Sequence, residues 1–320
     1  VIATMLPIDK IIGKIYPLFA FSLLFMAGAL MVMLFVKMPQ LPELWTHFYN
    51  MGAEAEPEKW TDQIFPCLFI TIACGAISGF HATQSPLMAR CVKSEHMGRP
   101  IFYGAMITEG VVALIWATVS SWFFYGSPAP GYELIAAVNT GFSTSAPAVV
   151  NIVCNDWLGV AGAILALLGV VAAPITSGDT AFRSARLIIG EWLHIDQRPI
   201  IKRLAICLPL FISSIAMLVW QIENPDGFNI IWQYFGWANQ TLSVFTLWTL
   251  TVYLVRQKKP YIITLIPALL MTTVCTTFLF VSKQAFHLPE NIGYLLGILC
   301  LVVALVWFIV WYRKEKSKLV

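Results

Sequence analysis

Eight long apolar stretches constrain the fold of this chain more than any other feature. A helix needs about 20 mainly apolar residues to cross a bilayer, and 58% of the 320 residues are hydrophobic while only 12% are charged. A soluble fold this apolar has too little polar surface to cover its core. We therefore predict an all-α, polytopic integral membrane protein that forms one membrane-embedded domain over residues 1–320. The predicted spans are residues 15–36, 64–85, 101–125, 157–180, 204–222, 229–255, 261–282 and 292–312.

The basic residues are distributed unevenly between the two sets of connecting loops. Seventeen of the 20 Lys and Arg residues lie in one set, whereas the opposite set holds Lys37, Lys59 and Lys283 together with ten of the acids. Cytoplasmic loops are the ones enriched in Lys and Arg, so the charge pattern predicts that both chain ends are cytoplasmic. Two outer loops are long, residues 37–63 and 126–156. The second is half apolar and either lies at the membrane interface or dips in as a re-entrant hairpin.

Two of the predicted spans concentrate Gly, Pro and small polar residues near their inner ends, at 78–86 and 174–180. Lipid cannot satisfy the backbone of a broken helix, so a break must face protein or a water-filled cavity. Transporters build substrate sites from such breaks, although small residues also occur wherever two membrane helices pack closely. The pattern Ser-Gly-x-x-Ala-x-x-Ser begins at Ser78 and again at Ser177. This similarity favours two breaks that face each other.

In the transporter interpretation, the solute contacts polar side chains at the two breaks and an amide pair in the sixth span. The amides alternatively form hydrogen bonds across helices. Arg90 and Arg183 are placed to attract a carboxylate from the inner side. The candidate substrate-binding residues are Ser78, His81, Thr83, Gln84, Ser85, Thr176, Ser177, Thr180, Asn239 and Gln240.

Two acidic residues are candidates for proton exchange. Glu109 lies about nine residues in from the inner end of the third span, where a side chain has difficulty reaching water. A buried carboxyl group can exchange a proton near neutral pH, which a proton-coupled carrier requires. We predict this role for Glu109 and Asp179. The alternatives are a structural carboxyl at Glu109 and a simple ion pair between Asp179 and Arg183, which lie one helical turn apart.

Four sequence blocks are distinctive: SGFHATQSPLMARC (78–91), GRPIFYGAMITEGVVALIWA (98–117), PITSGDTAFRSARL (174–187) and FGWANQTL (235–242). In this order they resemble the carbon starvation protein A (CstA) family, and the resemblance covers about residues 1–255. It implies a proton-driven secondary active transporter of the inner membrane that imports peptides or pyruvate during carbon starvation. It also implies a fold like that of the amino acid–polyamine–organocation superfamily. Family members carry a further N-terminal membrane region, so we expect this chain to correspond to a C-terminal portion.

Other classes of function fit the sequence less well. A membrane sensor that binds a nutrient without transporting it is the main alternative. An intramembrane hydrolase using His81 and Ser85 lacks an orienting carboxylate beside them, so we expect no enzymatic activity. Histidines and cysteines show no metal-ligand spacing, and no ATP-binding P-loop occurs. The expected partners are a small-molecule substrate and membrane lipid, with a proton in place of a cofactor, and no nucleic acid. The sequence leaves the oligomeric state open.

Overall fold

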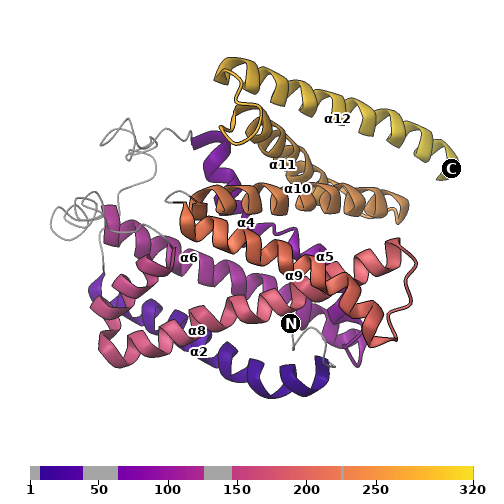
Figure 1. Cartoon of the computed structure of the whole chain (residues 1–320). Helices are drawn as coiled ribbons and strands as arrows, with labels where there is room; N and C mark the ends of the chain where they lie inside the picture. The colour runs from indigo at the N-terminus through magenta and orange to yellow at the C-terminus, as the bar shows by residue number, and fades with distance from the viewer. Residues whose placement is uncertain (1–7, 39–63, 126–145, 225–226, 320) are drawn as a thin grey trace. The chain divides into compact units, whose positions relative to one another are not determined.

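The computed structural model describes residues 8–38, 64–125, 146–224 and 227–319, and this part of the chain consists of helices and the turns between them (Figure 1). The contacts divide the chain into two compact units. Unit 1 comprises residues 1–47 and 92–222, and unit 2 comprises residues 48–91 and 223–320. Each unit therefore combines two stretches that are far apart in the sequence. The expectation of a single membrane-embedded domain stays a prediction.

Unit 1 is built around the pairing of its two longest helices, α2 and α8, with α6 packed against both. Gly169 of α8 allows the close approach, because a Cβ atom there would lie 2.9 Å from the backbone nitrogen of Leu23 in α2. The core includes Leu30, Val119 and Val153, each fully buried. The helices of unit 1 are α2 (Ile8–Lys37), η2 (Glu95–Met97), η3 (Arg99–Tyr103), α6 (Gly104–Tyr125), α8 (Ala146–Trp192) and α9 (Ile200–Glu223).

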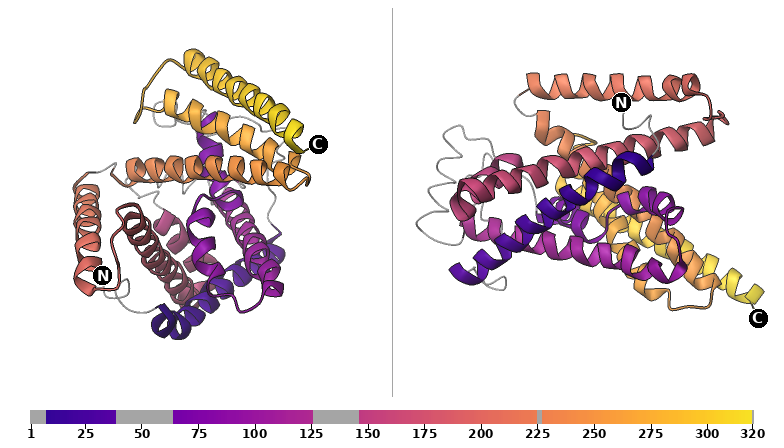
Figure 2. Two further views of the ribbon diagram at one scale, coloured as in Figure 1. Left: turned by 90° about the vertical axis from the view of Figure 1, so that its right-hand side faces the viewer. Right: turned by 90° about the horizontal axis from the view of Figure 1, so that it is seen from below.

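Unit 2 consists of three consecutive antiparallel helices, α10, α11 and α12, with an interrupted helix lying against α10 (Figure 2). Helix α11 lies between α10 and α12 in the order of contacts, and its buried side chains Met271, Val274 and Cys275 form the core together with Ile70 of α4. The helices of unit 2 are η1 (Ile64–Leu68), α4 (Phe69–Ala76), α5 (Phe80–Ala89), α10 (Gly227–Arg256), α11 (Ile262–Val281) and α12 (Glu290–Leu319).

Two glycines set the packing of α12 on α11. A Cβ atom at Gly293 would collide with the side chain of Val281, and one at Gly297 would collide with the hydroxyl of Thr277. The two glycines lie four residues apart, so both are on the same face of α12. Small residues at this spacing let the backbones of two membrane helices approach closely.

Five helices in the described part of the chain are long and apolar enough to cross a membrane. Their outer surfaces carry large apolar side chains, such as Ile201 and Trp307, which are 83% and 74% exposed. So much exposed apolar surface indicates a lipid environment. The chain is therefore an all-helical integral membrane protein. The five helices are Pro17–Lys37, Glu95–Ser121, Ile200–Glu223, Ile262–Val281 and Glu290–Ser317.

The other three predicted spans are also helical, but they are either more polar or interrupted. The second predicted span divides into η1, α4 and α5, and the sixth corresponds to α10. The fourth lies within α8, which begins at Ala146 and so extends into the predicted outer loop 126–156. The rest of that loop, and nearly all of the first long loop, lie outside the described residues.

Candidate functional site

The predicted break in the second span is present, and it separates α4, which ends at Ala76, from α5, which begins at Phe80. Gly79 is buried, and a Cβ atom at this position would collide with the carbonyl oxygen of Asn239 and lie 2.7 Å from Cβ of Leu242. The break is therefore pressed directly against the backbone of α10. Glycine is required here by the close approach of two main chains.

Asn239 of α10 satisfies the polar groups that the break exposes. The first amides of a helix have no partner within the helix, and the Phe80 N–H donates to Asn239 Oδ1 at 3.0 Å. The Ser78 hydroxyl lies 3.3 Å from Asn239 Oδ1 and 3.2 Å from Asn239 Nδ2, so it exchanges hydrogen bonds with the amide. Asn239 is only 7% exposed. This side chain thus caps α5 and joins it to α10.

Gln240 and Ser243 continue the same polar contact along α10. Gln240 is fully buried, and its Nε2 lies 3.4 Å from the carbonyl oxygen of Ile70 in α4. The Ser243 hydroxyl donates to the Gln240 carbonyl oxygen at 2.6 Å. Of the two interpretations of the amide pair, the structure shows hydrogen bonds across helices. Both amide side chains are buried in this arrangement.

Helix α5 brings together the four polar residues predicted near the break. His81, Thr83, Gln84 and Ser85 are all half-buried, and the Thr83 hydroxyl donates to the Phe80 carbonyl oxygen at 2.9 Å within the helix. Arg90 is exposed at the end of α5. These residues therefore share one short helix whose start is fixed by Asn239.

A cavity of about 330 Å³ at one end of unit 2 is lined by polar residues that the sequence analysis did not identify. The Tyr234 hydroxyl donates to the Gln284 carbonyl oxygen at 2.6 Å and so ties the loop after α11 to α10. A smaller adjoining cavity shares Gln233 and extends along α10 to Gly236. Among the lining residues, Lys283 could have been singled out from the sequence, because it is one of three basic residues in the acidic set of loops. The polar lining residues of the larger cavity are Gln233, Ser282, Lys283, Gln284, His287 and Glu290.

The predicted break at 174–180 is wrong, because α8 is helical throughout these residues. Proline removes one backbone hydrogen bond of a helix, and here the helix continues past Pro174. The interruption in α8 lies instead at Gly159, where φ is +65° and ψ is −177°. Gly178 has open space around it, unlike Gly79. The two Ser-Gly motifs are therefore not equivalent in structure, and the expectation of two breaks that face each other is wrong.

Asp179 and Arg183 form an ion pair on α8 with an O–N distance of 3.1 Å, and their side chains are 8% and 7% exposed. The simple pairing that the sequence left open is thus present. Thr180 is half-buried one residue along, while Ser177 is exposed. The side chain of Thr176 lies outside the described residues.

Glu109 is exposed on α6, a helix long and apolar enough to cross a membrane, so the expected burial of its carboxyl group within the membrane stays a prediction. Its depth along the helix follows from the sequence, but the side of α6 on which it lies does not. The neighbours Thr108 and Val111 are also exposed, whereas Ile115 and Val119 make the contact with the core of unit 1.

Comparison with known proteins identifies the family. A model described as carbon starvation protein CstA matches residues 1–126 and 132–278. The chain belongs to the CstA family. An uncharacterized membrane protein of Haemophilus influenzae is 47% identical over 148 residues, which are 43% of this chain and 40% of that protein. The peptide transporter CstA of Bacillus subtilis is 28% identical over 328 residues, covering 90% of this chain and 54% of its own length.

Part of the chain is also similar to a second kind of transporter. The pyruvate/proton symporter BtsT of Escherichia coli is 41% identical over 75 residues, which are 23% of this chain and 10% of that protein. The chain spans about half the length of the curated CstA peptide transporters that it matches. No solved structure shows significant similarity to it. The family predicted from the four sequence blocks is thus confirmed, and the superfamily stays a prediction.

Within this CstA-family chain, the predicted site residues fall into two groups. Ser78 and Asn239 are in direct contact in unit 2, and Gln240 lies one residue further along α10. Asp179 and Arg183 are paired in unit 1. The structure therefore joins the predicted residues within each unit. It adds the cavity in unit 2, whose lining comes from three separate stretches of sequence.

Proposed function

We propose that this chain works in a secondary active transporter that imports a small organic nutrient, a peptide or pyruvate, across the inner membrane with proton coupling, as part of a response to carbon starvation. The names of the relatives support this proposal: several are peptide transporters and one is a pyruvate/proton symporter. The structural observation that carries it is the polar face of α10, which leads from the cavity of unit 2 to the capped break.

This polar face has the spacing of one side of a helix. Gln233 lines the cavity, Gln240 contacts α4, and Ser243 lies beside Gly79. A volume of about 330 Å³ lies within the range of small-molecule sites, roughly 300–1,000 Å³. The hydrogen bonds of Asn239 hold α5 against α10 and so keep the end of this polar face beside the break closed. In this proposal, transport requires α5 to separate from α10, and Ser78, His81, Thr83, Gln84 and Ser85 then face the solute.

Proton coupling is assigned to Asp179 and Glu109, and attraction of a carboxylate to Arg183 and Arg90. Asp179 has the burial that favours such a role, whereas Glu109 is exposed. The proposal also places both chain ends in the cytoplasm, and the charge asymmetry of the loops supports this orientation. No resident cofactor is part of this proposal.

Uptake into proteoliposomes tests the proposed transport. Labelled pyruvate and a labelled dipeptide are supplied under an imposed proton gradient, and we expect accumulation of at least one. Asn239→Ala should abolish it, because transport needs a closed state as well as an open one and the closed position of α5 is then lost, while Thr249→Ala on the exposed side of α10 should not. Thermal unfolding of both variants shows whether the loss reflects misfolding. A solute that binds but never accumulates would favour the nutrient sensor instead.

The coupling residues require a separate comparison. In Asp179→Asn and Glu109→Gln, gradient-driven accumulation should fall while exchange of labelled for unlabelled solute continues without a gradient. Glu191→Gln, an exposed acid on α8, is the matched control. If both variants accumulate solute as the unmodified chain does, neither acid carries the coupling proton.

A further inference from the structure

The two adjoining cavities of unit 2 meet at three residues that belong to different helices. The larger cavity has a volume of about 330 Å³ and the smaller one about 90 Å³. Cys67 of η1, Gln233 of α10 and Phe278 of α11 line both cavities. The junction formed by these three residues therefore divides the hollow at this end of unit 2 into two parts.

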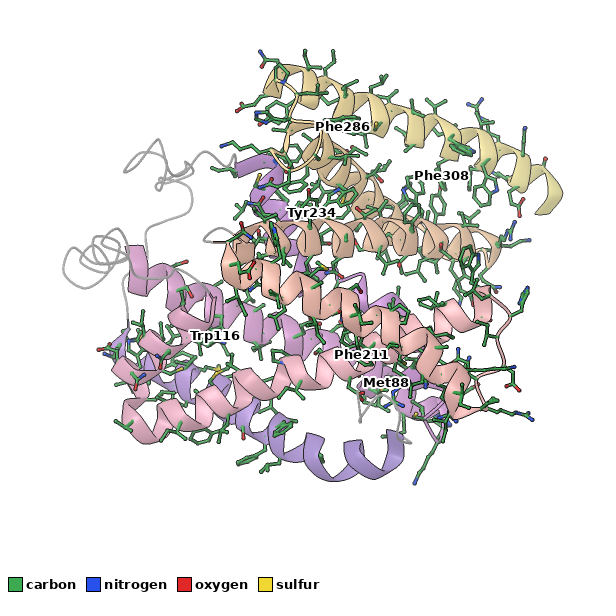
Figure 3. The ribbon with its side chains drawn as sticks, in the orientation of Figure 1. Met88, Trp116, Phe211, Tyr234, Phe286 and Phe308 are labelled. Atoms are coloured by element: carbon green, nitrogen blue, oxygen red, sulfur yellow. The ribbon has the colours of Figure 1, made fainter. Side chains whose placement is uncertain are left out.

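The larger cavity is polar away from the junction, and its wall is held in place by the protein. That wall includes the turn between α11 and α12, where the Ser282 hydroxyl donates to Gln284 Oε1 at 2.7 Å. The ring of Phe286 stacks on that of Phe280 with centroids 5.9 Å apart. The Tyr234 hydroxyl holds the same turn against α10 (Figure 3 labels Tyr234 and Phe286). The polar wall is thus fixed by contacts within unit 2.

The smaller cavity has a mainly apolar and aromatic wall. The rings of Trp232 and Phe235 pack with their centroids 5.8 Å apart, and a Cβ atom at Gly236 would lie 3.2 Å from Cγ2 of Ile70. An apolar cavity of about 150 Å³ can bind benzene, so one of about 90 Å³ is large enough for a small branched alkyl group. Beyond the junction, the lining residues are Ile70, Thr71, Trp232, Phe235 and Gly236.

Gln233 is the polar group at the junction. Its side chain is half-buried, and its amide has no hydrogen-bond partner among the residues that the structure describes. An amide offers both a donor and an acceptor. Its neighbours at the junction are the thiol of Cys67 and the ring of Phe278, so Gln233 marks the point where the polar wall gives way to the apolar one.

We propose that the two cavities form one site for a solute with a polar head and an apolar side group. The head lies in the larger cavity, the side group enters the smaller one, and Gln233 forms a hydrogen bond with the polar part beside the junction. Burial of an apolar group adds affinity, whereas a polar group of the same size would lose its hydrogen bonds to water.

This proposal rests on the proposed function, because it takes the occupant to be the transported solute. It adds a preference that the proposed function does not contain. Among peptides, those with a branched apolar side chain should bind best. Pyruvate, which has only a methyl group, leaves the smaller cavity largely unfilled.

Protection of Cys67 from chemical modification measures binding without transport. The purified full chain in detergent reacts with methyl methanethiosulfonate, and mass spectrometry reads the modified fraction of each cysteine. Alanyl-leucine is compared with alanyl-asparagine, whose side chain has the same size and branching. We expect alanyl-leucine to slow the modification of Cys67, and alanyl-asparagine to need a concentration about tenfold higher or more. Cys91, which is exposed and lines neither cavity, is the internal control and should react at an unchanged rate.

Gln233→Leu tests the junction itself. It should weaken protection by both peptides about threefold to tenfold, because one hydrogen bond to the solute is lost. Thr249→Leu, on the exposed side of α10, is the matched control and should bind as the unmodified chain does. The comparison of the two peptides on the unmodified chain decides the proposal even if Gln233→Leu fails to fold.

Equal protection by the two peptides, or protection by neither, overturns the proposal. A Cys67 that never reacts also overturns it, because no small molecule then reaches the junction. Protection by added phosphatidylglycerol and by neither peptide would assign the cavities to lipid instead.

The outcome is separate from that of the transport assay. Alanyl-leucine that protects Cys67 but never accumulates in proteoliposomes supports the site and contradicts transport. Accumulation of both peptides with equal protection of Cys67 contradicts the site and leaves transport in place.

Discussion

At the scale of single residues, the contact of Gly79 with α10 shows how a missing side chain can position a site. The backbone of Gly79 is in the ordinary helical region, with φ −62° and ψ −19°, so its conformation does not require glycine. The neighbours do, because the Asn239 carbonyl occupies the place of a Cβ atom. The cap that Asn239 forms on α5 therefore depends on the small size of residue 79.

We expect Gly79→Ala to lower the stability of the chain by about 1–3 kcal/mol, because overpacking a contact between two backbones forces them apart. Gly104→Ala is the matched control, since Gly104 has φ −62° and a Cβ atom added there would have no heavy atom within 4 Å. Thermal and denaturant unfolding in detergent measure both variants. Equal stability of the two would contradict the close contact.

At this scale, chemistry alone identifies the polar residues within a span, but the fold decides what they contact. Adjacent amides within a span need partners, so the sequence singles out Asn239 and Gln240. Their partners Ser78 and Ile70 lie about 160 and 170 positions away in the chain, and only the fold brings them together. For Glu109, the sequence gives the position along α6, but this position does not determine which side of the helix the residue occupies.

At the scale of elements, the helices followed from apolar length, but the interruption of α8 did not. The predicted span 229–255 corresponds to Gly227–Arg256, and 261–282 corresponds to Ile262–Val281. Composition indicated a break near Pro174, yet a helix can lose one hydrogen bond and continue. The interruption lies instead at Gly159, a single glycine with no distinctive neighbours. The sequence could not predict it, because it depends on a backbone conformation that the sequence does not show.

Gly159→Ala should lower stability by about 1–3 kcal/mol, since φ +65° with ψ −177° is a region that essentially only glycine adopts. No atom lies within 4 Å of an added Cβ, so the cost is confined to the backbone. Gly178→Ala on the same helix also meets open space, and should be neutral or slightly stabilising because alanine favours helix. Unfolding measurements that rank the two variants equally would show that the interruption is not needed.

The pairing of α11 and α12 allows a test by compensation. Gly297→Ala should destabilise the chain by about 1–3 kcal/mol, because its methyl group would collide with the Thr277 hydroxyl. That hydroxyl is buried and has no hydrogen-bond partner in the described part of the chain, so Thr277→Ala alone should cost little.

The double variant should then recover most of the stability that Gly297→Ala loses. A double-mutant cycle of unfolding free energies measures this coupling. Additive effects would show that the two residues do not meet.

At the scale of the whole molecule, charge and family motifs were informative because they are spread along the entire chain. The motif blocks 78–91 and 235–242 belong to unit 2, while 98–117 and 174–187 belong to unit 1. The interleaving of the two units and the cavity of unit 2 could not be predicted from one sequence. Both depend on contacts between segments separated by more than 100 residues, which no local pattern records.

The orientation is a whole-molecule prediction, because it rests on 17 of the 20 basic residues lying on one side. In a Cys91→Ser background, which removes an exposed cysteine, Ser317→Cys and Lys283→Cys are treated with a membrane-impermeant maleimide. We expect Ser317→Cys to react only in inverted vesicles and Lys283→Cys only in right-side-out vesicles. Residue 317 belongs to the basic C-terminal end. Residue 283 lies in the acidic set of loops, and α12 is the one predicted membrane crossing between the two positions. Labelling of both from the same side would contradict α12 as a span, and labelling with the sides exchanged would contradict the orientation alone.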